Sequence, residues 1–174
     1  KTIALRADFD ALPIQDEKEV AYKSKVPGVM HACGHDLHTS ALLGVAKVLS
    51  EHKDEVPGTV VFIHQFAEET TPGGAEYMIK DGCLDGVDVI YGSHVMSLQP
   101  YGTFSVIEGY ASSAQDDFYI TIHGKGGHGA SPHETIDALV TGSQVVLNLQ
   151  QIVSRRVDPL KAAVITVGSF QSGS

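Results

Sequence analysis

The chain has 174 residues, of which 43% are apolar and 19% charged, a composition typical of a globular protein with a buried core. Its formal net charge of −9 provides no electrostatic footprint for nucleic acid or for an anionic membrane, so we expect a small-molecule partner instead. The two cysteines, Cys33 and Cys83, are too few for a disulfide framework, which favours a reducing, cytoplasmic setting.

The first part of the chain alternates β-branched runs with helical patterns. The predicted elements, in chain order, are a strand over 2–5, a helix over 37–50, a strand over 59–63, a helix over 75–80 and a strand over 87–91. This alternation predicts an α/β sheet. Because the sequence opens directly in a strand and ends just after another, we interpret it as a fragment of a longer protein.

The pattern changes near Ser112, where Phe118, Ile120 and Ile122 alternate with polar residues as in a sheet with one solvated face. A glycine-rich loop over 124–129 precedes a predicted helix over 134–153 and a strand over 163–167. The apolar residues expected to share one face of that helix are Ile136, Leu139, Val140, Val146, Leu147 and Val153. We therefore predict two domains, 1–111 and 112–174, the second too small to bury its own apolar faces.

A dense group of polar residues precedes the helix predicted to begin at Leu37. His31-Ala32-Cys33-Gly34-His35-Asp36-Leu37-His38 holds three histidines, a thiol and a carboxylate. Cysteine and histidine suit zinc and related metals, and Gly34 would allow Cys33 and His35 to converge on one ion. A lone Cys-x-His pair is more often structural, so the interpretation depends on further ligands.

Such ligands follow two predicted strands. Glu68 and Glu69 come just after the strand over 59–63, and His94 follows the next strand, so all three could reach the carboxyl edge of the sheet. One glutamate could bind metal while the other acts as general base, although a Glu-Glu pair alone is usually a solvated loop. Asp8, after the first strand, could orient a ligand imidazole or simply cap a turn.

A cysteine nucleophile is the competing interpretation, with Cys33 attacking and His35 as its base. That dyad would leave Glu68, Glu69 and His94 without a role. A metal site uses all of them, and we prefer it for that reason.

The sequence resembles the metallopeptidase superfamily of aminoacylases and carboxypeptidase G, in particular the amidohydrolase branch with hippurate hydrolase, plant auxin-conjugate hydrolases and N-acetyl-diaminopimelate deacetylase. The segments that carry the resemblance are Leu5-Arg6-Ala7-Asp8-Phe9-Asp10-Ala11-Leu12-Pro13, Met30-His31-Ala32-Cys33-Gly34-His35-Asp36, Phe66-Ala67-Glu68-Glu69, Gly92-Ser93-His94-Val95 and Gly126-Gly127-His128-Gly129-Ala130-Ser131-Pro132-His133. Together these motifs are highly specific.

The resemblance implies a role for each of these residues. Cys33, His35, Glu69 and His94 would bind one or two divalent metal ions, which could be zinc, manganese, nickel or cobalt. Glu68 would be the general acid and base, and Asp8 would support the site from behind. His128 would hold substrate or stabilise the oxyanion.

The resemblance also implies a fold and a reaction. We expect a partial zinc-peptidase-like α/β catalytic domain followed by the first part of an inserted ferredoxin-like α+β lid domain, which makes a homodimer or higher oligomer. The expected reaction is hydrolysis of the amide bond of N-acyl amino acids or similar small conjugates. A further metal-binding histidine of the family has no counterpart in these 174 residues, so a non-catalytic, dimerising pseudo-enzyme is the alternative.

Overall fold

The computed structural model describes residues 1–173, which form two compact units. The first unit is Lys1–Ala114, and the second begins at Gln115, close to the expected division between 111 and 112. Each unit is described by itself below.

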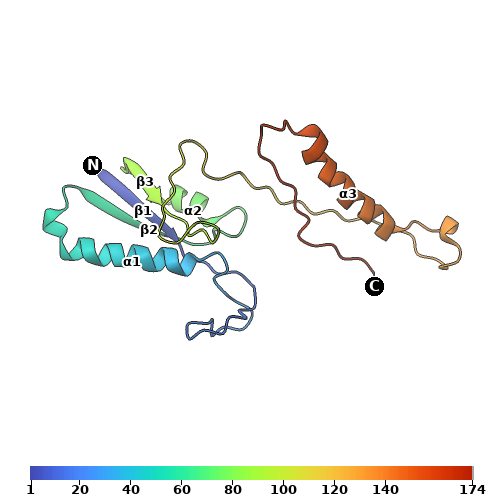
Figure 1. The fold of residues 1–174 in the computed structure, drawn as a ribbon, viewed down its shortest axis with the longest axis horizontal. Helices are drawn as coiled ribbons and strands as arrows, with labels where there is room; N and C mark the ends of the chain where they lie inside the picture. Colours follow the sequence, from blue (N-terminus) through green and yellow to red (C-terminus); the bar gives the residue numbers. More distant parts are fainter. Residues whose placement is uncertain (174) are drawn as a thin grey trace. The chain divides into compact units, whose positions relative to one another are not determined.

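The first unit contains a three-stranded parallel sheet in the order β2-β1-β3 (Figure 1). The strands are β1 (Thr2–Asp8), β2 (Thr59–Gln65) and β3 (Val89–Gly92). In the register of the sheet, Asp8 lies opposite Gln65, and Arg6 lies opposite Gly92. The three strands therefore end at one edge, and the segments that follow them start side by side.

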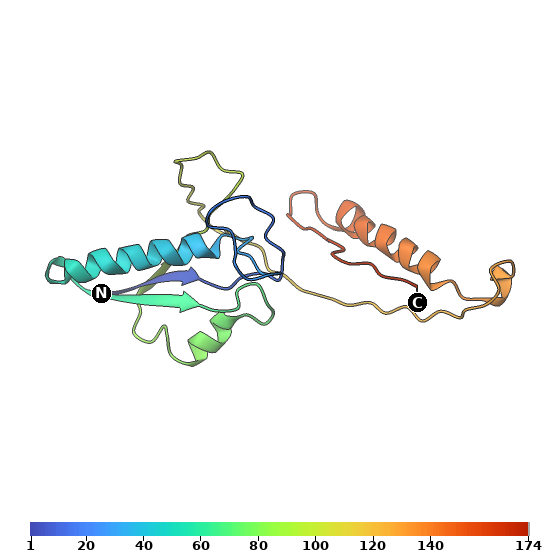
Figure 2. The ribbon, with the colours of Figure 1, turned by 90° about the horizontal axis from the view of Figure 1, so that it is seen from below.

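Two helices cover the sheet. Helix α1 (His35–Glu51) packs on β1 and β2, α2 (Gly74–Lys80) packs on β2, and Figure 2 shows them on opposite sides of the strands. A short 3-10 turn, η1 (Lys53–Glu55), lies in the connection between α1 and β2. All five predicted elements of this unit are present, which confirms the α/β class; α1 starts at His35 because Gly34, with φ of 85°, caps it.

The buried residues of this unit include unusually many polar ones. The buried apolar side chains are Ala4, Ala7, Leu42 and Ile63, whereas the buried polar ones are Asp8, Asp16, His35, His38 and Gln65. Buried polar groups require partners, so this edge of the sheet must be a network of hydrogen bonds, ion pairs or metal contacts.

The second unit has one long helix, α3 (Ala138–Arg156), after a 3-10 turn, η2 (Pro132–Glu134). The helix starts four residues later than 134 because Asp137 is its N-cap and accepts from the Val140 N–H at 3.0 Å. Ile136 is extended instead, and it exchanges two backbone hydrogen bonds of 3.0 Å with Lys125.

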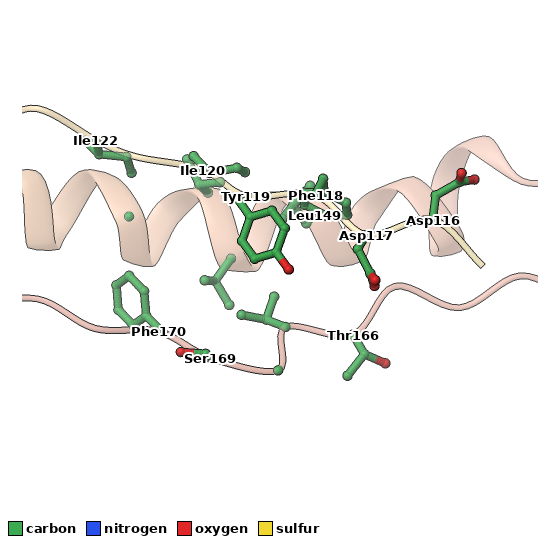
Figure 3. A pocket seen from close by; sticks show the side chains of 15 residues that line it. Asp116, Asp117, Phe118, Tyr119, Ile120, Ile122, Leu149, Thr166, Ser169 and Phe170 are labelled. Carbon is green, nitrogen blue, oxygen red and sulfur yellow. The ribbon is translucent and has the colours of Figure 1, made fainter. Parts of the chain in front are cut away.

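The predicted apolar face of α3 and the two predicted strands of this unit differ from the structure. Gly142, Val145, Val146 and Leu149 line a pocket between α3 and two extended segments, 116–122 and 166–170 (Figure 3), whereas Leu139, Val140 and Leu147 are exposed. Neither segment is a strand, because among residues 1–173 neither has a neighbour with which to form a hydrogen-bonded ladder. Within the same range, no helix is long and apolar enough to cross a bilayer.

Candidate metal centre

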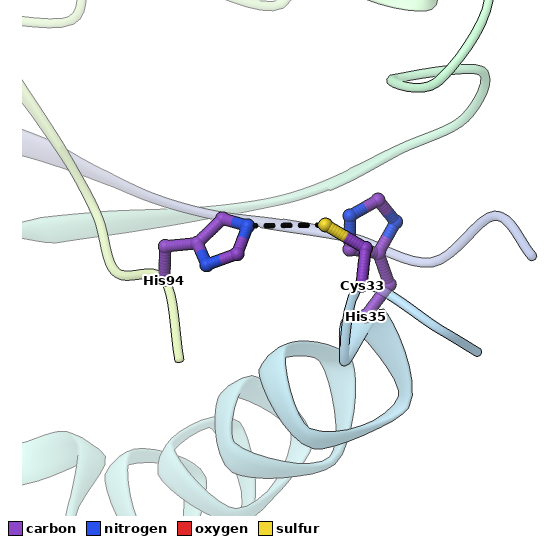
Figure 4. A group of neighbouring side chains, drawn as sticks. All are labelled: Cys33, His35 and His94. Atoms are coloured by element: carbon purple, nitrogen blue, oxygen red, sulfur yellow. Dashed lines mark hydrogen bonds between the residues drawn. The ribbon is translucent and has the colours of Figure 1, made fainter. Parts of the chain in front are cut away.

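The predicted site residues of the first unit gather around one imidazole, that of His35. Cys33, His35 and His94 offer ligand atoms that all lie within 4.8 Å of one another, and so do His35, Glu68 and Glu69. Cys33 comes from the turn before α1, His35 is the first residue of α1, the glutamates follow β2, and His94 follows β3. Figure 4 shows Cys33 between the rings of His35 and His94. The parallel sheet therefore brings together residues that are up to 61 positions apart.

Gly34 allows the cysteine turn and the His94 segment to approach each other. Its φ of 85° lies in the left-handed region, and a Cβ atom at this position would overlap the Val95 side chain. With glycine present, Cys33 Sγ lies 3.4 Å from His94 Nε2. The sequence analysis expected Gly34 to let Cys33 and His35 converge on one ion; in the structure Gly34 also leaves room for the Val95 side chain.

The orientation of His94 leaves one ring nitrogen available to a metal. Its Nδ1 lies 2.6 Å from the backbone oxygen of Val95, an acceptor, so Nδ1 carries the hydrogen and donates it. Nε2 therefore presents its lone pair, and this is the atom that faces Cys33.

His35 is held in the same tautomer by Asp10. Its Nδ1 donates towards the Asp10 backbone oxygen at 3.0 Å and the Asp10 carboxylate at 3.1 Å. The other carboxylate oxygen accepts from the Glu69 N–H at 3.0 Å. Burial raises the pKa of Asp10, but the N–H groups of Glu69 and Glu68 outweigh it and hold that pKa below its ordinary value. Asp10 thus joins two predicted ligands through one charged group.

The residues pass a direct test of fit to a cation. His35 Nε2 and Glu69 Oε1 are buried, have no hydrogen-bond partner and lie 3.7 Å apart. Both present lone pairs, so their approach is unfavourable unless a positive ion lies between them. Two ligands about 2.0–2.2 Å from a tetrahedral zinc ion are roughly 3.4 Å apart, close to the observed separation. This pair therefore has the chemistry and spacing of metal ligands.

The two glutamates differ in exposure. The side chain of Glu69 is 22% exposed and turns one oxygen inward, whereas that of Glu68 is 39% exposed, with Oε2 3.8 Å from His35 Nε2. Neighbouring residues thus reach the same imidazole in different environments, which permits different chemical tasks.

Asp8 contacts a histidine that the sequence analysis did not single out as a ligand. Its Oδ1 lies 2.6 Å from His38 Nδ1, while Oδ2 lies 2.8 Å from Arg6 and 3.8 Å from His35 Nε2. Burial raises the pKa of Asp8, but the His38 hydrogen bond and the Arg6 charge lower it below the ordinary value. The carboxylate that orients His35 is Asp10, which the sequence analysis missed. The signal for Asp10 was its place two residues after Asp8, where the chain leaves the same strand end.

The environment of Cys33 disfavours the thiol-nucleophile interpretation. Burial, then Glu69 and Glu68, raise the pKa of the thiol to about 11. A catalytic cysteine needs a lowered pKa, usually from a nearby cation. His94 lies within reach of Cys33, but the negative charges of Glu69, Glu68 and Asp8 disfavour a thiolate there. A bound metal ion would favour the thiolate.

A pocket of about 730 Å³ opens beside Cys33 and His94. Its apolar lining includes Leu37, Val95, Met96 and Leu98, and the loop between Leu12 and Met30 contributes Lys18 and Tyr22.

His128 belongs to the second unit, where it is exposed and its Nδ1 accepts from the Ala130 N–H at 3.1 Å. Its role in catalysis stays a prediction.

Comparison with known proteins gives one family and several close relatives. The model of peptidase family M20/M25/M40 matches residues 4–154. The chain is 62% identical to the Bacillus subtilis protein named "Putative amidohydrolase YhaA" over 97% of the chain and 43% of that protein. It is 53% identical to the N-acyl-L-amino acid amidohydrolase of Geobacillus stearothermophilus, over 100% of the chain and 47% of that enzyme. The chain thus spans less than half the length of these relatives.

A solved structure provides a third comparison. The Bacillus subtilis YXEP protein, described as a dinuclear metal binding peptidase of family M20, matches with a TM-score of 0.59 and 48% identity. The match covers 62% of this chain and 30% of the YXEP chain.

Proposed function

Because the chain belongs to peptidase family M20/M25/M40, we propose that the full-length protein is a metal-dependent amidohydrolase acting on N-acyl amino acids or similar small conjugates. Two named relatives support this class of substrate, an N-acyl-L-amino acid amidohydrolase and an N-acetyl-L-cysteine deacetylase that is 46% identical over 99% of the chain and 41% of its own length. The observation that carries the proposal is the buried pair of lone pairs on His35 Nε2 and Glu69 Oε1, which face each other 3.7 Å apart.

In this proposal Cys33, His35, Glu69 and His94 bind one or two divalent metals, for which zinc, manganese, nickel and cobalt are the candidates. A similar structure, the YXEP protein, is described as dinuclear. His35 belongs to all three groups of potential ligands but has only Nε2 free, so it would bind one ion, and a second ion would need the other residues of these groups. When bound, the metal would supply Lewis acidity to the scissile carbonyl and to water.

Glu68 is the proposed general base. Its carboxylate lies beside the ligand cluster yet is the more exposed of the two glutamates, so it can meet both water and substrate. It would take a proton from the attacking water and return it to the leaving nitrogen, which would depart as a free amine. Asp10 would hold His35 and Glu69 in place meanwhile, by the hydrogen bonds described above.

The pocket beside Cys33 and His94 is the proposed place for the substrate. Its mixture of apolar side chains with a lysine fits a small conjugate that has an apolar group and a carboxylate. We also propose that residues from Gln115 onward start a lid domain that forms a homodimer, and that His128 there contacts substrate. Size measurement of the full-length protein by light scattering would test the dimer.

The test of the proposed function is a pair of matched variants of the full-length protein. Glu68→Gln should reduce turnover of acetyl- and benzoyl-amino acids by at least ~100-fold and leave metal content unchanged, since a general base contributes roughly 10²- to 10⁴-fold. Glu69→Gln should lose metal itself. Retained activity in Glu68→Gln would refute the mechanism, and a metal-loaded wild type that cuts no N-acyl amino acid would favour the pseudo-enzyme.

A further inference from the structure

His38 lies one turn after His35 on α1 and is only 4% exposed. It makes two short contacts with groups outside its helix. Its Nδ1 lies 2.6 Å from Asp8 Oδ1 at the end of β1, and its Nε2 lies 2.9 Å from the backbone nitrogen of Val95, after β3. The ring is therefore a bridge between two strand ends.

The identity of these partners determines which nitrogen carries the hydrogen. A backbone N–H can only donate, so Nε2 must accept from Val95, and Nδ1 must donate to the Asp8 carboxylate. Asp8, His35 and His38 lie close enough together to suggest a metal site of their own. However, His38 has no lone pair left for a metal, because both ring nitrogens are already engaged.

We propose that His38 is a positioning residue that fixes the orientation of His94, and that it is not itself a ligand. Val95 links the two histidines. Its N–H is held by His38 Nε2, and its carbonyl oxygen accepts from His94 Nδ1 at 2.6 Å. The His94 and His38 rings also pack edge to face, with centroids 4.6 Å apart. The direction in which His94 Nε2 points, towards Cys33, thus depends on the His38 bridge.

The bridge continues on the other side of Asp8. Arg6 lies 2.8 Å from Asp8 Oδ2, and its Nε donates to Gln65 Oε1 at 2.9 Å. A continuous line of contacts therefore runs from the end of β2, through β1 and α1, to the segment after β3. These are the elements that carry the predicted ligands. The side chains of Asp8 and His38 are 1% and 2% exposed, so their charge-assisted hydrogen bond is shielded from water.

Two substitutions separate the two ends of the bridge. In His38→Asn the shorter amide can still donate to Asp8 from the place of Nδ1, but it cannot reach Val95. In His38→Gln the longer amide can place an acceptor where Nε2 was and keep the Val95 contact. This inference rests on the metal site of the proposed function, so the experiment on the full-length protein needs one readout with metal and one without.

Without metal, the readout is amide hydrogen exchange at Val95. We expect exchange roughly fivefold or more faster in His38→Asn, the effect of one lost hydrogen bond, and close to wild type in His38→Gln. With Zn²⁺, we expect His38→Asn to weaken binding by roughly 10- to 100-fold at unchanged stoichiometry, as for other residues that hold metal ligands. We expect His38→Gln to bind Zn²⁺ within a few-fold of wild type.

His64→Gln is the matched control. His64 Nδ1 also makes a hydrogen bond between α1 and the sheet, to Thr39 Oγ1 at 2.8 Å, but His64 makes no hydrogen bond or ion pair with the predicted ligands. The control should keep Val95 protection and metal affinity. Unchanged Val95 exchange in His38→Asn, loss of a whole ion at saturating Zn²⁺, or equal weakening in His64→Gln would each overturn the proposal. If wild type binds no Zn²⁺, the proposed function fails while Val95 exchange still decides the role of His38.

Discussion

Replacing Asp10 by asparagine should weaken metal binding although Asp10 is not itself a predicted metal ligand. The carboxylate accepts from both His35 Nδ1 and the Glu69 N–H, at 3.1 and 3.0 Å. An amide has one oxygen, so it can accept only one of these hydrogens, and its NH₂ group must face the other donor. If the NH₂ faces the imidazole, it favours the tautomer with hydrogen on Nε2, the nitrogen needed for metal.

The expected magnitude follows from the lost hydrogen bond. A hydrogen bond to a charged group is worth about 1.5–3 kcal/mol. Since ~1.4 kcal/mol corresponds to tenfold in affinity, Asp10→Asn should raise the Kd for Zn²⁺ by roughly 10- to 100-fold. Changes behind metal ligands in other proteins have effects of about the same size. Chelator competition on the full-length protein measures this directly.

Another aspartate, Asp16, provides the control. Asp16 is 2% exposed and accepts from the backbone N–H groups of Lys18 and Ser24, but it does not contact the predicted ligands. Asp16→Asn should lower stability and leave Zn²⁺ affinity within a few-fold of wild type. Wild-type affinity in Asp10→Asn, or an equal loss in Asp16→Asn, would refute the reasoning.

The pH dependence of stability provides an independent check on Asp10. Burial raises its pKa, but the N–H groups of Glu69 and Glu68 hold it below the ordinary value. The stabilisation is therefore complete above the unfolded-state pKa of about 4 and is lost as pH falls through the lower folded value. In urea unfolding of the metal-free protein, the destabilisation caused by Asp10→Asn should shrink as the pH falls below about 4. A difference that stays constant would contradict the assigned contacts.

Two further predictions concern the turn before α1. Gly34→Ala should destabilise the protein by at least ~1–2 kcal/mol in urea unfolding and weaken metal binding, since the added Cβ is strained at a φ of 85° and overlaps Val95. The control Gly44→Ala, in an open part of α1, should stabilise by roughly 0.5–1 kcal/mol, and similar losses in both would count against the turn argument. Because burial, Glu69 and Glu68 raise the pKa of Cys33 to about 11, iodoacetamide should modify it slowly at pH 7 in the metal-free protein and faster as the pH approaches that value. Mass spectrometry, with Cys83 as internal reference, measures the rate of this modification. Rapid modification of Cys33 at pH 7 would contradict the raised pKa and support the thiol-nucleophile interpretation.

The elements of the first unit and the edge at which its ligands meet could be predicted from sequence. Alternating strands and helices imply a parallel sheet, and Glu69 and His94 both follow strands of that sheet, so they had to lie at the same edge. The tasks of Asp10 and His38 could not be predicted in this way. Each depends on which nitrogen of a histidine carries the hydrogen, and that is settled by partners 25 to 57 residues away in the chain.

The second unit was harder to predict for a different reason. Alternation at Phe118, Ile120 and Ile122 identifies an extended segment with one apolar side, but a strand also needs a partner with a matching hydrogen-bond ladder. In α3, apolar residues lie on more than one side, so helical spacing alone could not select Gly142, Val145 and Leu149 as the packed face. Asp137 could be identified as the N-cap of α3 only from the structure, in which Ile136 is extended and pairs with Lys125.

The loop between Leu12 and Met30 begins just after Asp10 and ends just before Cys33. Two backbone hydrogen bonds of 2.9 and 3.1 Å between Leu12 and Met30 close its base, and Asp16 organises its interior. Because the base is tied independently, changes in the length or sequence of this loop need not disturb the residues on either side of it. Its Lys18 and Tyr22 line the pocket beside Cys33. If the pocket holds the substrate as proposed, loop exchange between homologues should alter substrate preference and leave the predicted metal ligands unchanged.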